Sequence, residues 1–200
     1  MIFDYEQGSP EWFEARIGSI GGSSIQSVCA KGTGKTRKSL LYRFAGEILS
    51  GEKYEGYQNE HMQRGIEQEA EARKAYELFY DKTINQVGLV RRNSHYKHYS
   101  PDGFENPDGI IEIKCRIPST YIETVLTNKV PAVDRKQIQW GLHICEREYC
   151  KFISYSPTVK VNPLHVIHVE RDEKLIKTLD EEADKFVEEM LSIVERIKRG

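Results

Sequence analysis

The most informative stretch of this 200-residue sequence is residues 100–114, which read SPDGFENPDGIIEIK. Residues 106–109, Asn-Pro-Asp-Gly, are rich in turn formers, and Asp108 is most simply one of them. The flanking segments 97–102 and 109–115 are predicted to be strands joined by this turn. We therefore expect a β-hairpin here.

Asp102 and Glu112 become cross-strand neighbours if the turn is centred midway between them. Such neighbours have Cβ atoms about 5 Å apart, and two carboxylates that close repel each other unless a cation lies between them. Their hard oxygen ligands suit Mg²⁺ or Mn²⁺. Lys114 lies two residues after Glu112 and so faces the same side, while Ile111 and Ile113 face a core. A lysine there can orient or activate a water or stabilise charge on a phosphate, so the pattern predicts phosphodiester hydrolysis.

The alternative is a surface hairpin that happens to carry two acids and a lysine. A third acid would favour the metal site, and Glu69 is the candidate because it lies one turn after Gly65 in a predicted helix. Glycine inside a helix costs about 1 kcal/mol, so it suggests a close approach. Either Glu69 reaches the metal or it belongs to a charged helix face, where Glu67 and Glu71 compete for the same role.

The composition is that of an ordinary globular protein. Apolar residues make up 38% and charged residues 30% of the chain, as in soluble domains. No repeat or linker interrupts residues 1–200, which predicts a single domain. No apolar run approaches the roughly 18 residues that span a membrane, and the first residues lack a basic segment followed by an apolar stretch. We expect a cytoplasmic protein without a membrane partner.

Other site types find little support. The four cysteines are too scattered for a disulfide scaffold or a zinc site. Residues 32–36, Gly-Thr-Gly-Lys-Thr, resemble a phosphate-binding loop, but Cys29 stands where its first glycine is required. The net charge of −2 argues against a protein that coats nucleic acid, although a local basic patch can still hold phosphates. We interpret the segment as a mobile loop that contacts DNA phosphates through Lys31, Lys35, Arg37 and Lys38.

The order of predicted elements indicates an α/β or α+β domain with a central mixed β-sheet flanked by helices. A helix starts at Pro10, with Ser9 as its N-cap, and ends near Gly18. Further helices are predicted from Ser23 to before Gly32 and at 37–49, 59–80, 118–128, 134–147 and 172–198, and further strands at 84–92, 150–156 and 163–170. The last helix carries an apolar stripe for a core or a subunit interface, formed by Ile176, Leu179, Ala183, Phe186, Met190, Val194 and Ile197.

Several short motifs occur in a characteristic order over about residues 10–175. They are Trp12-Phe13-Glu14-Ala15-Arg16-Ile17-Gly18 with Ser23, Arg64-Gly65 with Glu69, Ser100-Pro101-Asp102-Gly103 with Glu112-Ile113-Lys114-Cys115, Gln137-Ile138-Gln139, and Val169-Glu170-Arg171-Asp172-Glu173. This set resembles the phage lambda exonuclease-like recombination nucleases, of the viral alkaline exonuclease type, within the PD-(D/E)xK restriction-endonuclease-like superfamily. Residues 115–118 depart from the pattern, because Arg116 and Ile117 stand between the cysteine and the proline.

The resemblance implies a restriction-endonuclease-like core and Mg²⁺-dependent 5′-to-3′ exonuclease activity on linear double-stranded DNA. It implies two Mg²⁺ ions, with Mn²⁺ as a substitute, and a 3′ single-stranded overhang for recombination by strand annealing. The implied partners are double-stranded DNA ends, a single-strand annealing protein, and two further copies of the chain in a ring-shaped homotrimer. The implied setting is a bacterial host, with the chain encoded by a phage or prophage.

The resemblance also assigns roles residue by residue. Asp102 and Glu112 correspond to metal ligands, helped by the backbone carbonyl of Ile113, and Lys114 to the catalytic lysine. Glu69 corresponds to an additional acid near the metals, and Gln139 to a residue that holds the site. The 5′-terminal phosphate is assigned to Arg16 and Ser23, joined by Ser100; arginine suits this task because its planar fork meets phosphate oxygens in pairs.

Two alternatives remain open. The first is another nuclease of the same superfamily, either an endonuclease or an iron–sulfur nuclease, although the cysteine positions speak against the iron–sulfur type. The second is a non-catalytic DNA-binding scaffold. The matching side-chain directions of Asp102, Glu112 and Lys114 argue against a silent site.

Overall fold

A computed structural model describes residues 1–30, 35–54 and 60–200, with residues 60–64 and 66 as backbone only. Lys31 and the glycine-rich residues 32–34 lie outside the described residues. The elements are β1 (Ile2–Phe3), α1 (Pro10–Glu14), α2 (Gly22–Val28), α3 (Lys35–Ser50), α4 (Glu60–Tyr80), β2 (Ile84–Asn85), β3 (Leu89–Arg91), β4 (His98–Tyr99), β5 (Gly103–Glu105), β6 (Gly109–Cys115), α5 (Pro118–Thr127), α6 (Ala132–Cys145), β7 (Tyr149–Tyr155), β8 (Leu164–Glu170) and α7 (Glu173–Lys198).

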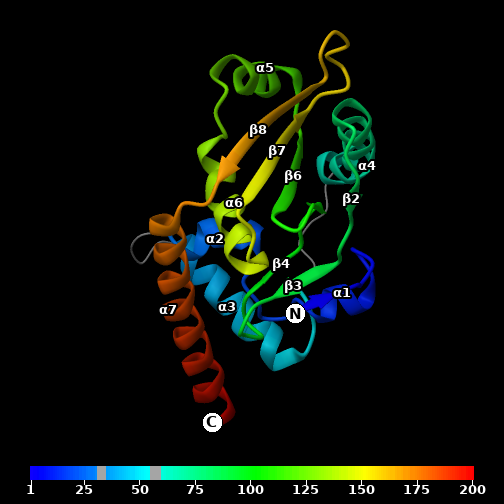
Figure 1. The fold of residues 1–200 in the computed structure, drawn as a ribbon. Coiled ribbons are helices and arrows are strands. Elements are labelled where there is room, and N and C mark those ends of the chain that lie inside the picture. The colour runs from blue at the N-terminus through cyan, green and yellow to red at the C-terminus, as the bar shows by residue number, and fades with distance from the viewer. Residues whose placement is uncertain (31–34, 55–59) are drawn as a thin grey trace.

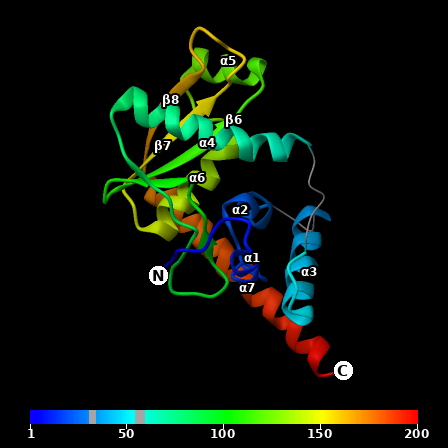
Figure 2. The ribbon, with the colours of Figure 1, turned by 90° about the vertical axis from the view of Figure 1, so that its right-hand side faces the viewer.

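The central sheet has five strands in the order β2-β5-β6-β7-β8 (Figure 1). β6 and β7 run parallel and the other neighbours antiparallel, so the sheet is mixed. Helix α4 lies across one face (Figure 2), where Ala72 and Tyr76 pack against Ile111 and Ile113. On the opposite face Ile110 joins a larger core that includes side chains of α2, α3, α6 and α7. The predicted mixed sheet flanked by helices is thus confirmed.

A second, three-stranded sheet has the order β1-β3-β4. The prediction of one strand over 84–92 was wrong, because the chain leaves the central sheet after β2 and enters this smaller sheet at β3. Gly88 lies between the two strands, and a Cβ there would stand 1.9 Å from the carbonyl oxygen of Tyr5. The backbone of the N-terminal segment therefore packs directly on Gly88, where the predicted strand is interrupted.

The strand predicted at 97–102 was also wrong in its bounds. His98 and Tyr99 pair with β3, while Lys97 forms an isolated bridge with Ile20. Pro101 follows, and proline cannot donate a backbone hydrogen bond to a strand ladder. The hairpin is instead formed by β5 and β6, with Gly103 opposite Ile111. Continuing this register by one residue puts Asp102 opposite Glu112, as the sequence predicted.

Most predicted helices are present with shifted ends. Ser9 caps α1 by accepting a hydrogen bond from the Trp12 backbone, but α1 ends already at Glu14. Helix α3 begins at Lys35, within the segment predicted as a loop. The apolar stripe of α7 is buried except for Ile197, which is 63% exposed. No helix in the described part of the chain is long and apolar enough to cross a bilayer.

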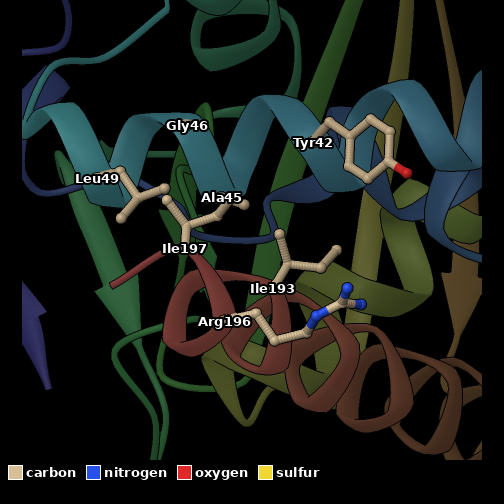
Figure 3. A pocket seen from close by; sticks show the side chains of 7 residues that line it. All are labelled: Tyr42, Ala45, Gly46, Leu49, Ile193, Arg196 and Ile197. Atoms are coloured by element: carbon tan, nitrogen blue, oxygen red, sulfur yellow. The ribbon is translucent and has the colours of Figure 1, made fainter. Parts of the chain in front are cut away.

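A shallow groove of about 490 Å³ runs between α3 and α7 (Figure 3). Its lining consists of Tyr42, Ala45, Gly46, Leu49, Ile193, Arg196 and Ile197. The groove is mainly apolar, and Arg196 is its one ionisable side chain apart from the phenol of Tyr42. It offers no pair of acid and base, so the chemistry has to be sought elsewhere.

The buried stripe of α7 should contribute most of the stability that this helix adds. Phe186 is fully buried and contacts Phe44 of α3 edge-on, with ring centroids 5.9 Å apart. We expect Phe186→Ala to lower the free energy of unfolding by about 3–5 kcal/mol in urea denaturation. The exposed Ile197→Ala serves as control and should change it by less than about 0.5 kcal/mol. Equal effects would mean that α7 does not pack through this stripe.

Candidate active site

The predicted carboxylate pair lies on neighbouring strands. Asp102 directly precedes β5, and Glu112 is the middle residue of β6. The backbone N–H of Ile113 donates to Asp102 Oδ2 at 2.6 Å, which holds Asp102 against β6. Glu112 is 1% exposed. Its Oε1 accepts from Lys114 Nζ at 2.5 Å and from the Gln137 side chain, while its Oε2 accepts from the Tyr99 hydroxyl. The structure thus brings together Asp102, Glu112 and Lys114.

Tyr99 reaches Glu112 because two glycines leave room for its ring. A Cβ on Gly22 of α2 would stand 2.6 Å from the ring, and one on Gly141 of α6 would stand 2.5 Å from it. Real Cβ atoms do not come this close, so the ring of Tyr99 occupies the space that a side chain at position 22 or 141 would need. Tyr99 was not predicted as a site residue, because its role depends on this packing between two distant helices.

Glu69 approaches the pair from α4. Its carboxylate forms an ion pair with Arg73 at 2.5 Å, one turn further along the helix. Arg73 is 9% exposed and also donates from Nε to the backbone carbonyl of Asp102 at 3.1 Å. Arg73 therefore links Glu69 to the Asp102 backbone. Glu67, which competes with Glu69 for the role of metal ligand, is exposed.

Asp102 and Glu69 have perturbed pKa values. Burial raises the pKa of Asp102 well above its usual range, and the charges of Glu112 and Glu69 raise it further. The pKa of Glu69 is raised by burial and by Glu112, against the lowering effect of Arg73. Burial alone would lower the pKa of Lys114, but Glu112 and Asp102 reverse this and raise it. Lys114 is therefore a protonated cation at neutral pH.

Gln137, and not Gln139, contacts the carboxylates. Two residues that are two positions apart on a helix point about 200° apart. The two glutamines of α6 therefore cannot both face the carboxylate pair. Gln139 is 1% exposed and donates to the Glu170 carbonyl at 2.8 Å, while its oxygen accepts from the Asp172 backbone at 2.8 Å. Gln139 thus joins the end of β8 to the start of α7. The spacing alone could have warned that only one of the two reaches the site.

A second cluster of predicted residues forms around Trp12. The guanidinium carbon of Arg16 lies 3.7 Å above the centroid of the Trp12 ring, and the indole Nε1 donates to Ser100 Oγ at 3.1 Å. Burial lowers the pKa of Arg16 to about 10, which leaves it charged at neutral pH. Arg16 and Trp12 line a cavity of about 760 Å³ together with Glu69 and Arg73. Of the three acids, Glu69 thus shares a cavity with the second cluster.

The remaining predicted phosphate contacts are spread over α2 and α3. Ser23 lines a separate pocket between α2 and α3, which is rich in hydroxyl groups. Arg37 is engaged in a two-bond ion pair with Glu189 of α7, at 2.7 and 2.9 Å. Lys35 and Lys38 lie on α3, where the Lys38 ammonium is 5.5 Å from the centroid of the Tyr42 ring. None of these residues lines the cavity that Arg16 lines.

The departure at residues 115–118 has a local explanation. Arg116 donates its backbone N–H to the Tyr155 carbonyl at 2.7 Å, and its side chain forms an ion pair with Asp134 of α6. Ile117 is the N-cap residue of α5 and Pro118 its first residue. The two additional residues extend the strand end toward α5 and leave the carboxylate pair in place.

The donors of this site suit a divalent cation by their chemistry. No group of three or more His, Cys, Asp or Glu side chains within residues 1–30, 35–54 and 60–200 is already gathered for a metal. The reason is visible in the ion pairs, since Lys114 engages Glu112 and Arg73 engages Glu69. Asp102 keeps one carboxylate oxygen without a partner among the described residues. Carboxylate oxygens are hard donors, and a divalent cation nearby would favour the charged forms of Asp102 and Glu69, whose pKa values are raised.

Comparison with known proteins gives one family and several similar structures. Residues 11–148 match the YqaJ-like viral recombinase domain. The alkaline exonuclease LHK-Exo from Laribacter hongkongensis is 30% identical, with a TM-score of 0.87 over 96% of this chain and 97% of that one. Its complex with dAMP superposes with a TM-score of 0.89 at 31% identity, over the same shares of the two chains.

More distant similarities agree with this fold. A phage-related exonuclease from Haemophilus somnus 129PT has a TM-score of 0.70 at 16% identity, over 90% of this chain and 96% of that one, which shows a shared fold alone. The Escherichia coli (strain K12) protein ExoD is 32% identical over 54 residues. That segment is 27% of this chain and 62% of ExoD, so the chain spans less than two thirds of that relative.

Asp102 should destabilise the folded protein at neutral pH. Its pKa is higher in the folded protein than in the unfolded chain, so the folded state favours the protonated acid, and stability is lost as pH rises through the folded pKa. We expect Asp102→Asn to raise Tm by roughly 2–4 °C at pH 8 in EDTA, and to have little effect below the pKa of the unfolded chain. Asp108→Asn, on the exposed turn, is the control. A lower Tm for Asp102→Asn would contradict this.

Proposed function

The chain belongs to the family of YqaJ-like viral recombinase domains, and we propose that it is a metal-dependent exonuclease that digests one strand of linear double-stranded DNA from its 5′ end. One observation carries the proposal. The carboxylates of Asp102 and Glu112 face each other beside Lys114, next to a cavity lined by both Glu69 and the cationic Arg16. The proposed cut site and the proposed phosphate site would thus lie side by side.

Asp102 and Glu112 would hold a divalent cation, with the backbone carbonyl of Ile113 and, after release from Arg73, Glu69. The cation we propose is Mg²⁺, with Mn²⁺ as a substitute and two ions in all. Bound there, it would supply Lewis acidity and lower the pKa of a bound water. The Ile113 backbone lies against Asp102, which supports its place in this ligand set.

Lys114 acts as a fixed positive charge in this proposal. Its ammonium lies 2.5 Å from Glu112 Oε1, which places the positive charge beside the carboxylate pair. A protonated lysine beside a phosphate stabilises the charge that develops on the phosphate oxygens. Gln137 and Tyr99 both donate to Glu112, and so fix the carboxylate orientation.

Arg16 would bind the 5′-terminal phosphate. Among the described residues no carboxylate forms an ion pair with its guanidinium, although it is cationic and half-buried. A phosphate would supply the missing counter-charge, and an arginine can meet it with two parallel hydrogen bonds. The hydroxyl of Ser100, which accepts a hydrogen bond from the Trp12 indole, would be a further donor to the phosphate. A site for the end phosphate beside the cut site accounts for 5′-to-3′ polarity.

The biological setting is part of the proposal. Family membership supports a role in recombination, in which the 3′ single strand left by digestion passes to a single-strand annealing protein. A ring-shaped homotrimer around DNA and a location in the cytoplasm of a bacterial host follow from the same resemblance. Lys31, Lys35 and Lys38 would add contacts to DNA phosphates outside the cut site.

Digestion of end-labelled duplex DNA tests the activity. With Mg²⁺ the protein should release the 5′ label of linear DNA as mononucleotides, leave a closed circle intact, and stop in EDTA. Lys114→Ala should lower the rate by about 100-fold or more while DNA binding in a gel-shift assay persists. Lys151→Ala, on neighbouring β7, is a lysine control. Nicking of the circle would indicate an endonuclease, and the absence of hydrolysis with any divalent metal a DNA-binding scaffold.

The two glutamines of α6 provide a matched pair of variants. Gln137→Ala removes a donor to Glu112 and should lower kcat by about 10-fold or more with little change in Tm. Gln139→Ala removes two buried hydrogen bonds and should lower the free energy of unfolding by about 1–3 kcal/mol with a smaller effect on kcat. Kinetics and thermal melting of both variants decide the matter, and the reverse pattern would restore Gln139 to the site.

A further inference from the structure

His98 lies on β4 beside Tyr99, and the two side chains point to opposite sides of the strand. Tyr99 reaches Glu112, whereas His98 reaches Arg16. His98 is 2% exposed. Its Nε2 lies 3.1 Å from Arg16 Nε, and its Nδ1 lies 2.7 Å from the hydroxyl of Ser19. Both ring nitrogens are therefore engaged by the segment that carries Arg16.

The partners of His98 determine where its proton lies. A guanidinium has no lone pair to offer, so Arg16 Nε–H donates and His98 Nε2 accepts. The single proton of the neutral ring is then on Nδ1 and is donated to Ser19 Oγ. Burial and the nearby charges of Arg16, Lys53 and Arg91 lower the pKa of His98 well below its usual value. The ring stays neutral, which preserves the acceptor for Arg16.

Arg16 is held on several sides but keeps its two terminal nitrogens available. Trp12 supports the face of the guanidinium, and Lys53 Nζ donates to the Arg16 carbonyl at 2.9 Å. His98 engages the inner nitrogen, Nε. Within the described part of the chain the terminal nitrogens make no hydrogen bond, and Arg16 lines the cavity that also contains Glu69. This arrangement presents the outer edge of the fork to the cavity.

We propose that His98 is a positioning residue, which fixes the guanidinium plane of Arg16 so that its outer edge receives the 5′-terminal phosphate. The inference deepens the proposed function and rests on it. The surroundings of the ring are built to hold it in place. Trp140 Nε1 donates to the His98 carbonyl at 3.0 Å, and a Cβ on Gly21 would stand only 2.6 Å from His98 Nε2. A side chain at position 21 would displace the ring from Arg16.

The test compares two amide substitutions of His98 on two substrates. His98→Gln keeps an acceptor near the position of Nε2, whereas His98→Asn keeps a polar group only near the position of Nδ1. The substrates are duplexes that differ only in a 5′-phosphate or a 5′-hydroxyl, and the readout is the ratio of kcat/KM between them. A general loss of folding or catalysis affects both substrates and leaves this ratio unchanged.

We expect the wild type to prefer the phosphorylated end and His98→Gln to keep most of that preference. His98→Asn should lower the ratio by about tenfold, which is the usual effect of a lost hydrogen bond to a charged group, and Gly21→Ala should lower it in the same direction. An unchanged ratio in His98→Asn, or an equal loss in His98→Gln, overturns the proposal. A wild type without any preference would instead remove the proposed role of Arg16, and this inference with it.

A measurement on the unaltered protein covers the case in which the variants fail to fold. In ¹⁵N NMR at pH 7 the His98 ring should be neutral, with its proton on Nδ1 and none on Nε2. A proton on Nε2, or a doubly protonated ring, would exclude Arg16 as a donor to His98 and overturn the proposal.

Discussion

The site depends on the pairing of β5 with β6, which holds two carboxylates next to each other on interior strands of the central sheet. Asp102 and Glu112 would separate if the register were free to slip, because like charges repel. The sheet opposes this with the buried isoleucines of β6 on one side and the short turn on the other. Lys114 pairs with Glu112 and Arg73 with Glu69, which compensates part of the negative charge of the three acids. The energy of folding thus maintains an arrangement that the charges alone would disperse.

Much of this could be predicted from the sequence because it follows from local rules. The alternation of Glu112 and Lys114 with isoleucines fixes which side chains face the acids, and the turn residues fix the register. Side chains whose roles arise from packing could not be predicted in this way. Tyr99 and His98 gain their partners only when α2, α6 and β4 come together. Gly88 likewise shows its importance only once the backbone of Tyr5 is placed against it.

The Gln-x-Gln pattern illustrates a different limit. A motif carried over from a family supplies residue types, whereas helix geometry decides which of them reaches the site. Gln137 and Gly141 lie on the same face of α6. Gln137 donates to Glu112, and Gly141 packs against the ring of Tyr99. Gln139 points away and joins β8 to α7. The hydrogen bonds of Gln139 therefore hold the sheet to the last helix.

Strand β4 connects the two halves of the proposed site. Because His98 and Tyr99 are adjacent, one peptide unit and two rings set the separation between Arg16 and Glu112. Both rings pack closely against glycines, since a Cβ on Gly21 would clash with the His98 ring and one on Gly22 with the Tyr99 ring. A rigid spacing of this kind would make the distance from a bound end phosphate to the cut bond a property of the fold. In the proposed exonuclease it would favour a product of constant length at each cut, and a loop in the same place would not.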